Sequence, residues 1–238
     1  MKTISLTNNN IEQINKEFAV KTVAERLAFL FTLSQENIVF STSFGLEDQI
    51  LTHLISSANL PVKFITLDTG RLFQETYNVF ELTRARYKIA VHVYVPDKDE
   101  LEEFVNANGI NSFYHSVEQR KLCCKIRKVS PLNRALKGAA VWITGLRAAQ
   151  SEAREKLQFL ELDAEHGLLK CNPLLDWSLE QAETFAAEHK IPLNTLHAKG
   201  FPSIGCAPCT RAIEPGEDIR AGRWWWENSK KECGLHSA

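Results

Sequence analysis

Apolar residues recur along the chain at helical spacing in some stretches and as short continuous runs in others. Between residues 11 and 33 the spacing predicts one amphipathic helix. The short runs predict buried strands, and the segments between them predict helices, which begin at Glu47 and cover residues 72–88. The predicted strands comprise residues 38–40, 62–67, 91–95 and 139–144, the last with helices on either side.

This alternation of strands and helices indicates the fold class. Strands that alternate with helices of this length form βαβ units, so we expect an α/β fold with a mainly parallel sheet flanked by helices. From Pro202 onward Gly, Pro, Cys, Arg and Trp dominate, and the periodicity disappears. The expected parts are an N-terminal helical segment (1–36), an α/β domain (37–201) and a C-terminal functional tail (202–238).

Composition and charge narrow the classes of partner. The chain has 238 residues, 44% apolar and 24% charged, with a net charge of −1. This balance gives no reason to expect nucleic acid or a membrane as partner. The first ten residues are polar and no run approaches a membrane span, so we expect a cytoplasmic protein. Thiols stay reduced there, and clustered cysteines then indicate a metal centre or catalysis more than disulfides.

The loops that follow the predicted strands are candidate ligand sites, because parallel sheets bind ligands beyond the carboxyl ends of their strands. Small residues in the first loop let backbone N–H groups approach a phosphate, although serine also caps many ordinary helices. Arg147 in the third loop and Arg154 close behind can clamp a phosphate or sulfate, although either alone is typical of a solvated face. Together the loops favour anion binding. They are Ser41–Asp48, Leu67–Arg71 and Gly145–Ser151.

Four of the six cysteines fall into two tight groups, Cys123-Cys124 and Cys206-x2-Cys209. Four thiols suffice to hold zinc or an iron–sulfur cluster, and spacing alone does not separate the two. Two unrelated core pairs or a redox-active Cys-x-x-Cys are the alternatives. If Cys123 and Cys124 begin a helix, its dipole would help to hold two thiolates. Cys171 has no partner in sequence and is expected in the core.

A lone thiol near the C-terminus has the surroundings of a nucleophile. Lys230, Lys231 and His236 flank Cys233 and would lower the pKa of its thiol. Upstream, Arg220 and Arg223 precede three consecutive tryptophans, which cannot all face one core. We therefore expect Cys233 to react with an electrophile, separately from the four clustered cysteines.

These motifs together resemble the assimilatory sulfonucleotide reductases, specifically the iron–sulfur adenylylsulfate reductases, over residues 38 to 236. The motifs that carry the resemblance are Ser43-Phe44-Gly45-x-Glu47-Asp48, Leu67-Asp68-Thr69-Gly70-Arg71, Cys123-Cys124-x3-Lys128-x2-Pro131-Leu132, Gly145-Leu146-Arg147-x2-Gln150-Ser151, Cys206-x2-Cys209-Thr210-Arg211, Gly222-Arg223-Trp224-Trp225-Trp226 and Glu232-Cys233-Gly234-Leu235-His236.

The resemblance implies an adenine-nucleotide α-hydrolase-like fold, with residues 37–201 as its nucleotide-binding domain. It also implies one 4Fe–4S cluster, with a C-terminal tail that is both cluster-binding and catalytic. Relatives that reduce phosphoadenylyl sulfate lack the four cluster ligands, so the expected substrate is adenylyl sulfate, although some cluster-bearing members accept both. The implied cluster ligands are Cys123, Cys124, Cys206 and Cys209.

The implied reaction is attack by Cys233 on the sulfur of adenylyl sulfate, which releases AMP and leaves an S-sulfocysteine. Thioredoxin or a glutaredoxin then releases sulfite. Similar proteins are usually homo-oligomers. His236 is expected to assist Cys233 or bind phosphate. The other expected substrate-binding residues are Thr42, Ser43, Gly45, Leu67, Asp68, Thr69, Gly70, Lys128, Arg147, Arg154, Arg220 and Arg223.

Two other functional classes remain as hypotheses. Related ATP pyrophosphatases share a Ser-Gly-Gly-x-Asp-Ser loop, from which Ser43-Phe44-Gly45-Leu46-Glu47-Asp48 departs, and this counts against ATP cleavage. A non-enzymatic module that binds zinc or a cluster would leave the arginine-bearing loops unexplained.

Overall fold

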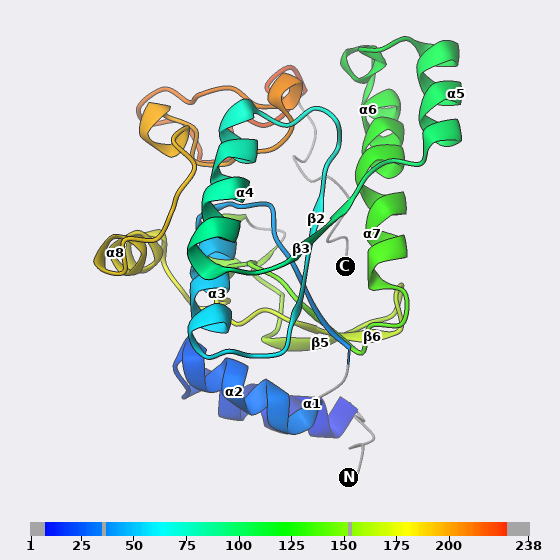
Figure 1. Cartoon of the computed structure of the whole chain (residues 1–238). Helices are drawn as coiled ribbons and strands as arrows, with labels where there is room; N and C mark the ends of the chain where they lie inside the picture. Colours follow the sequence, from blue (N-terminus) through cyan, green and yellow to red (C-terminus); the bar gives the residue numbers. More distant parts are fainter. Residues whose placement is uncertain (1–7, 35–36, 152–153, 228–238) are drawn as a thin grey trace.

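The computed structural model describes residues 8–34, 37–151 and 154–227 (Figure 1). The predicted nucleophile Cys233 and its neighbours Lys230, Lys231 and His236 lie outside these ranges. The expectations about their placement therefore stay predictions.

The N-terminal segment forms two helices, α1 (Asn8–Ala19) and α2 (Val23–Leu33), where the sequence predicted one. Thr22 and Glu25 form a capping box. The Thr22 N–H donates to Glu25 Oε2 (2.8 Å), and the Glu25 N–H donates to Thr22 Oγ1 (3.3 Å). This motif begins a new helix directly after α1. The prediction was wrong because the apolar spacing continues across the break.

One sheet of six strands runs through the described residues, in the order β3-β2-β1-β4-β6-β5. Neighbouring strands are parallel except at the edge, where β5 pairs antiparallel with β6. The mainly parallel α/β sheet is thus confirmed. The strands are β1 (Ile38–Ser41), β2 (Lys63–Leu67), β3 (Val91–Tyr94), β4 (Val141–Ile143), β5 (Leu160–Asp163) and β6 (Leu168–Cys171).

Helices cover both faces of this sheet, with α3, α4 and α8 on one side and α7 on the other (Figure 1). Both faces need a cover because alternate side chains of β1 are apolar on each of them. Ile38 and Phe40 join the core beneath α2 and α3, whereas Val39 packs with α7 on the opposite face. The remaining helices are α3 (Leu46–Ser57), α4 (Gln74–Tyr87), α5 (Lys98–Asn108), α6 (Val117–Cys124), α7 (Ser130–Leu136) and α8 (Leu179–Glu188).

Several elements were not predicted from the sequence. These are α5, α8 and the β5–β6 hairpin, whose tight turn includes Gly167 at φ +65°. The helix expected directly after the strand at 139–144 is instead a single 3₁₀ turn, Ala148–Gln150. The chain there must turn back into the hairpin, so the helical region resumes at α8.

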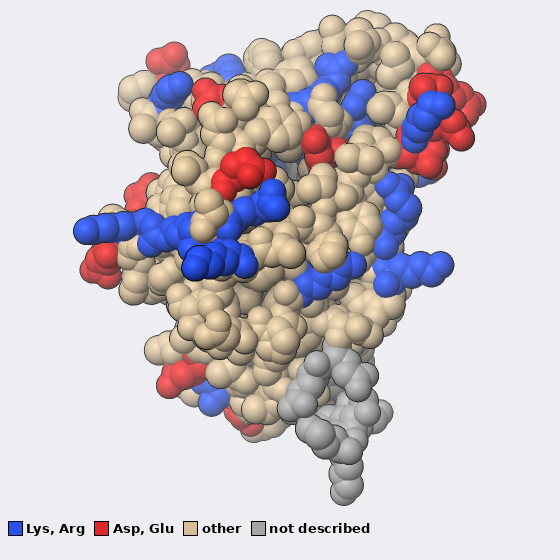
Figure 2. All heavy atoms as spheres, viewed as in Figure 1, with Lys and Arg blue, Asp and Glu red and all other residues tan. Residues whose placement is uncertain are grey.

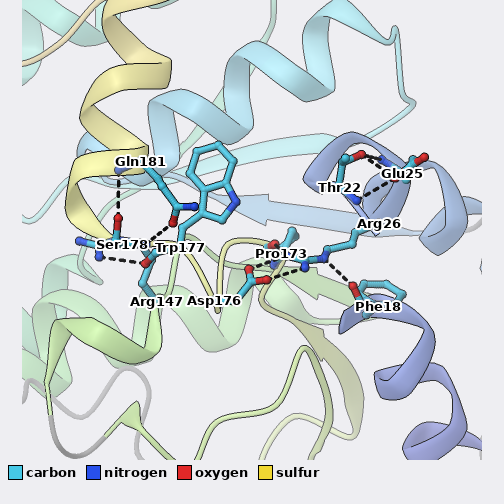
Figure 3. A network of polar contacts seen from close by, with 10 residues as sticks. All are labelled: Phe18, Thr22, Glu25, Arg26, Arg147, Pro173, Asp176, Trp177, Ser178 and Gln181. Carbon is cyan, nitrogen blue, oxygen red and sulfur yellow. Dashed lines mark hydrogen bonds and ion pairs between the residues drawn. The ribbon is translucent and has the colours of Figure 1, made fainter. Parts of the chain in front are cut away.

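Buried Arg26 fixes α2 to the segment that precedes α8 (Figure 3). Its guanidinium donates to both carboxylate oxygens of Asp176 (2.6 and 2.7 Å) and to the carbonyl oxygens of Phe18 (2.8 Å) and Pro173 (2.9 Å). Because bidentate pairs of this kind set orientation as well as distance, the chain from Pro173 to Trp177 is held firmly. That chain supplies a contact to the functional site.

Charges of both signs appear on the face shown in Figure 2, where acidic side chains gather over α5 and basic ones over the region of α4. None of the described helices is long and apolar enough to cross a membrane.

Candidate functional site

A pocket of about 520 Å³ lies at the carboxyl ends of the parallel strands. The strand order changes direction between β1 and β4, and open α/β sheets bind ligands at such a switch point. We call this cavity the strand-end pocket. Most of the predicted substrate-binding residues line it, namely Thr42, Ser43, Gly45, Leu67, Thr69, Lys128, Arg147, Arg154, Arg220 and Arg223. Asp68 and Gly70 are not among its lining residues.

The loop after β1 is held in shape by Asp48, a residue of α3. The backbone N–H and hydroxyl of Ser43 donate to Asp48 Oδ2 (2.6 and 2.7 Å). Burial raises the pKa of Asp48 to about 6, although the hydrogen bonds from Ser43 oppose the rise. A side chain at Gly145 would overlap the Asp48 carboxylate, so this glycine lets the loop after β4 approach α3. The conformation of this loop therefore depends on Asp48, its last residue, which already belongs to α3.

The loop after β2 forms a wall between the strand-end pocket and the cysteines. Asp68 turns inward and accepts hydrogen bonds from the Gly70 N–H and the Tyr77 hydroxyl (both 2.8 Å), which explains its absence from the pocket. Thr69 lines the pocket, and its hydroxyl lies 3.3 Å from the sulfur of Cys206. Arg71 faces the cysteines, not the pocket.

The two arginines after β4 both line the strand-end pocket and both have partners within the protein, and their role as an anion clamp stays a prediction. Arg147 is 2% exposed, and its Nε donates to Glu47 Oε1 (2.8 Å). Its Nη1 donates to the carbonyl oxygen of Trp177 (3.3 Å; Figure 3). Arg154 donates to the side chain of Gln150, which also accepts from the backbone N–H of Arg147 (3.1 Å). Arg147 thus lines the pocket as a paired charge.

All four clustered cysteines come together, although they belong to segments far apart in the chain. They are buried and line one cavity of about 20 Å³, which we call the cysteine cavity. No disulfide joins the described cysteines. Cys206 directly precedes a 3₁₀ turn, Ala207–Cys209, which Cys209 ends, and Cys123 and Cys124 end α6.

The idea that a helix N-terminus holds Cys123 and Cys124 was wrong. They lie at the end of α6, and the chain continues through a π-helical turn, Lys125–Val129, into α7. A π turn widens the helix locally and is frequent at functional sites. Here it directs Arg127 to the carbonyl oxygen of Thr69 (2.6 Å) and places Lys128 in the lining of both cavities.

Cations replace the helix dipole as the electrostatic partner of the thiols. Arg71, Arg120, Arg127 and Lys128 line the cysteine cavity. Burial raises the pKa of the Cys209 thiol to about 12, with Cys206 adding to the rise and Lys128 opposing it. Burial likewise raises the pKa of the Cys123 thiol, and the positive charge of Arg127 opposes the rise. The cavity thus combines dense thiols with fixed positive charge, which suits a centre that carries negative charge.

The segment before residue 228 is anchored on this cavity by contacts that the sequence did not predict. The Arg120 guanidinium donates to both carboxylate oxygens of Glu227 (2.9 and 3.0 Å) and stacks on Trp224, 4.5 Å from the ring centre. Trp224 is 1% exposed and Trp225 is 40% exposed, as expected for tryptophans that cannot all face one core. Arg120 and Glu227 showed no pattern in the sequence beyond their nearness to the cysteine and tryptophan motifs.

Cys171 lies apart from the other cysteines. It is fully buried among apolar side chains of the main core, and burial raises the pKa of its thiol. Its expected role as a core residue is consistent with this position.

Comparison with known proteins places these features in a family. The phosphoadenosine phosphosulfate reductase domain model matches residues 37–212. An adenosine 5'-phosphosulfate reductase of Agrobacterium fabrum is 48% identical over 239 residues, covering 99% of this chain and 92% of that protein.

Solved structures agree on the fold. The phosphoadenylyl-sulfate reductase of Candida auris, solved as a phosphate complex, has a TM-score of 0.75 at 29% identity, covering 89% of this chain and all of that chain. The FMN adenylyltransferase of Candida glabrata has a TM-score of 0.57 at 19% identity, covering 99% of this chain and 81% of that chain, and shows the fold alone. The chain belongs to the phosphoadenosine phosphosulfate reductase domain family.

Proposed function

We propose that this protein reduces adenylyl sulfate to sulfite and AMP in assimilatory sulfate reduction. The observation that carries the proposal is the position of the strand-end pocket beside the cysteine cavity, with Lys128 in the lining of both. The Agrobacterium relative named as an adenosine 5'-phosphosulfate reductase supports the substrate. Cavities that hold small ligands usually measure roughly 300–1,000 Å³, so the pocket has room for a nucleotide.

The two ends of the substrate have matching surroundings in the pocket. The loops at Thr42–Gly45 and Leu67–Thr69 present backbone groups and hydroxyls for the nucleotide. Lys128, Arg220 and Arg223 supply positive charge for the phosphosulfate. In this scheme these cations also stabilise the charge that develops on the departing phosphate.

The reaction needs a thiol from the C-terminal tail, and we assign this role to Cys233. Its thiolate attacks the sulfur of adenylyl sulfate, an S–S bond forms, the S–O bond to the phosphate breaks, and AMP leaves with the electron pair. A dithiol protein, thioredoxin or a glutaredoxin, then attacks the Cys233 sulfur and releases sulfite. Its second thiol closes the reductant's disulfide and restores the Cys233 thiol. His236 assists Cys233 or binds phosphate.

We assign a 4Fe–4S cluster to Cys123, Cys124, Cys206 and Cys209, whose thiols line the same cavity. Four buried thiols among four cations match the charge of such a centre. No three His, Cys, Asp or Glu side chains of the described residues are arranged to hold a single metal ion. When bound, the cluster supplies fixed charge and organises the site, while the electrons for the reaction come from thiols. Iron and acid-labile sulfide analysis tests this assignment.

Phosphoadenylyl sulfate is the second candidate substrate, alone or beside adenylyl sulfate, because the Candida auris structure is named for its reduction. ATP cleavage is a weaker alternative. The loop departs from the pyrophosphatase pattern at Phe44, which has φ +59° and packs its ring on Phe80. We also propose a cytoplasmic location, and assembly into homo-oligomers stays a prediction.

Steady-state sulfite production from each nucleotide in turn, with thioredoxin as reductant, tests the function. We expect efficient production from adenylyl sulfate and a much lower kcat/KM for its 3′-phosphorylated analogue. Comparable values would contradict the substrate preference. Absence of sulfite with both nucleotides, together with pyrophosphate release from ATP, would contradict the proposal and support the alternative of ATP cleavage.

A further inference from the structure

We propose that Gly205 is a positioning residue, whose missing side chain allows the guanidinium of Arg223 to lie against the cysteine loop at the wall of the strand-end pocket. The inference rests on the proposed function, in which Arg223 binds the phosphosulfate. It makes the loop that carries Cys206 and Cys209 part of the substrate site.

Arg223 is held in place on several sides. It is 7% exposed, and its Nη1 donates to Ser203 Oγ (3.2 Å) and to the carbonyl oxygen of Ile204 (3.4 Å). Its guanidinium also stacks on Trp224, 4.9 Å from the ring centre. Among the described residues its Nε has no hydrogen-bond partner, although it is buried. A buried guanidinium with an unused donor at a pocket wall is suited to receive an anion.

The guanidinium lies where a side chain at position 205 would begin. An ideal Cβ on Gly205 would stand 2.6 Å from Arg223 Cζ, 3.2 Å from its Nε and closer still to Nη2. Gly205 has no positive φ, so its backbone would accept alanine and the obstacle is the arginine itself. Because the partners above confine Arg223, a methyl group would push the guanidinium from this position.

The same short loop is tied to the cysteines. The Gly205 N–H donates to Thr210 Oγ1 (3.1 Å), and that hydroxyl donates to the carbonyl oxygen of Cys206 (3.0 Å). Thr210 forms an isolated bridge with Arg223, and the Trp224 N–H donates to the carbonyl oxygen of Cys209 (3.2 Å). The placement of Arg223 therefore depends on the conformation of the cysteine loop, which links the cysteine cavity to substrate binding through the protein backbone.

A double-mutant cycle on Gly205 and Arg223 tests this dependence. All proteins carry Cys233→Ser so that no transfer occurs, and adenylyl sulfate binding is measured by calorimetry beside iron content. Gly205→Ala should weaken binding by roughly 10- to 100-fold, the range for losing charged hydrogen bonds, with iron retained. In an Arg223→Lys background the same change should weaken adenylyl sulfate binding by less than about 3-fold, because lysine lacks the guanidinium that collides with the methyl group.

If Gly205→Ala weakens binding by the same factor in both backgrounds, the inference is overturned, even when the parent binds adenylyl sulfate normally. A parent that binds neither adenylyl sulfate nor AMP would overturn the proposed function and this inference with it. If Gly205→Ala loses iron, Ser203→Ala replaces it in the same double-mutant cycle. Ser203→Ala should weaken adenylyl sulfate binding by about 3- to 10-fold in the protein that keeps Arg223, and it should have no effect in the Arg223→Lys background. Equal losses in both backgrounds would contradict the proposal.

Discussion

The strand-end pocket encloses about 520 Å³ between loops that follow regular strands, whereas the cysteine cavity encloses about 20 Å³ between the end of α6 and loop segments. In the pocket, polar groups line a space large enough for a ligand. In the cysteine cavity, thiols and guanidinium groups are packed against one another with little room for water. A lost charge or ligand should therefore cost more in the cysteine cavity, where desolvation leaves the remaining partner uncompensated.

The largest expected effect follows removal of one proposed cluster ligand. Cys206→Ser should abolish bound iron, acid-labile sulfide and adenylyl sulfate reduction, because a serine hydroxyl does not replace the thiolate. Far-UV circular dichroism should stay close to that of the parent, since the sheet has a separate core. Unchanged iron content would show that Cys206 is not a ligand.

The next largest effect tests charge burial beside the cysteine cavity. Glu227→Gln removes the carboxylate that pairs with the buried Arg120 guanidinium and should lower the free energy of unfolding by about 3–5 kcal/mol in urea titrations. A matched control is Glu217→Gln, which breaks a similar bidentate pair with half-exposed Arg211. That change should cost at most about 1 kcal/mol. Equal costs for the two variants would remove the contrast between buried and exposed pairs.

Asp48 offers a test in the strand-end pocket through pH. Its folded pKa of about 6 lies above the ordinary value of 3.8, so the folded protein binds the proton more tightly. Its contribution to stability is full below pH 3.8 and is lost as the pH rises through about 6. The difference in unfolding free energy between the parent and Asp48→Asn should thus shift by about 2 kcal/mol against the parent between pH 4 and 7. A pH-independent difference would contradict the raised pKa.

The smallest effect is expected at the cysteine of the main core. Cys171→Ala should cost about 1 kcal/mol of stability and leave the iron content and sulfite production unchanged, because this thiol packs among apolar side chains. Reduced iron would mean that the cysteine cavity is not the whole metal centre.

Regular patterning accounts for what the sequence could predict. Short apolar runs located the parallel strands β1 to β4, and topology alone then brought the loops at Ser43, Thr69 and Arg147 to one sheet edge. Cysteine spacing likewise anticipated that two distant pairs would share a site. The pairing of Arg120 with Glu227 was not predictable, because the two residues stand 107 positions apart, one in α6 and the other in the tail without periodicity.

Transfer of radiolabelled sulfur from adenylyl sulfate to the protein, without reductant, is the most direct test of the division between a holding centre and a reacting thiol. The parent should acquire label on Cys233 and release it as sulfite when thioredoxin is added. Cys233→Ser should keep its iron and acquire no label. Label on that variant would contradict the account, because a different residue would then be the nucleophile.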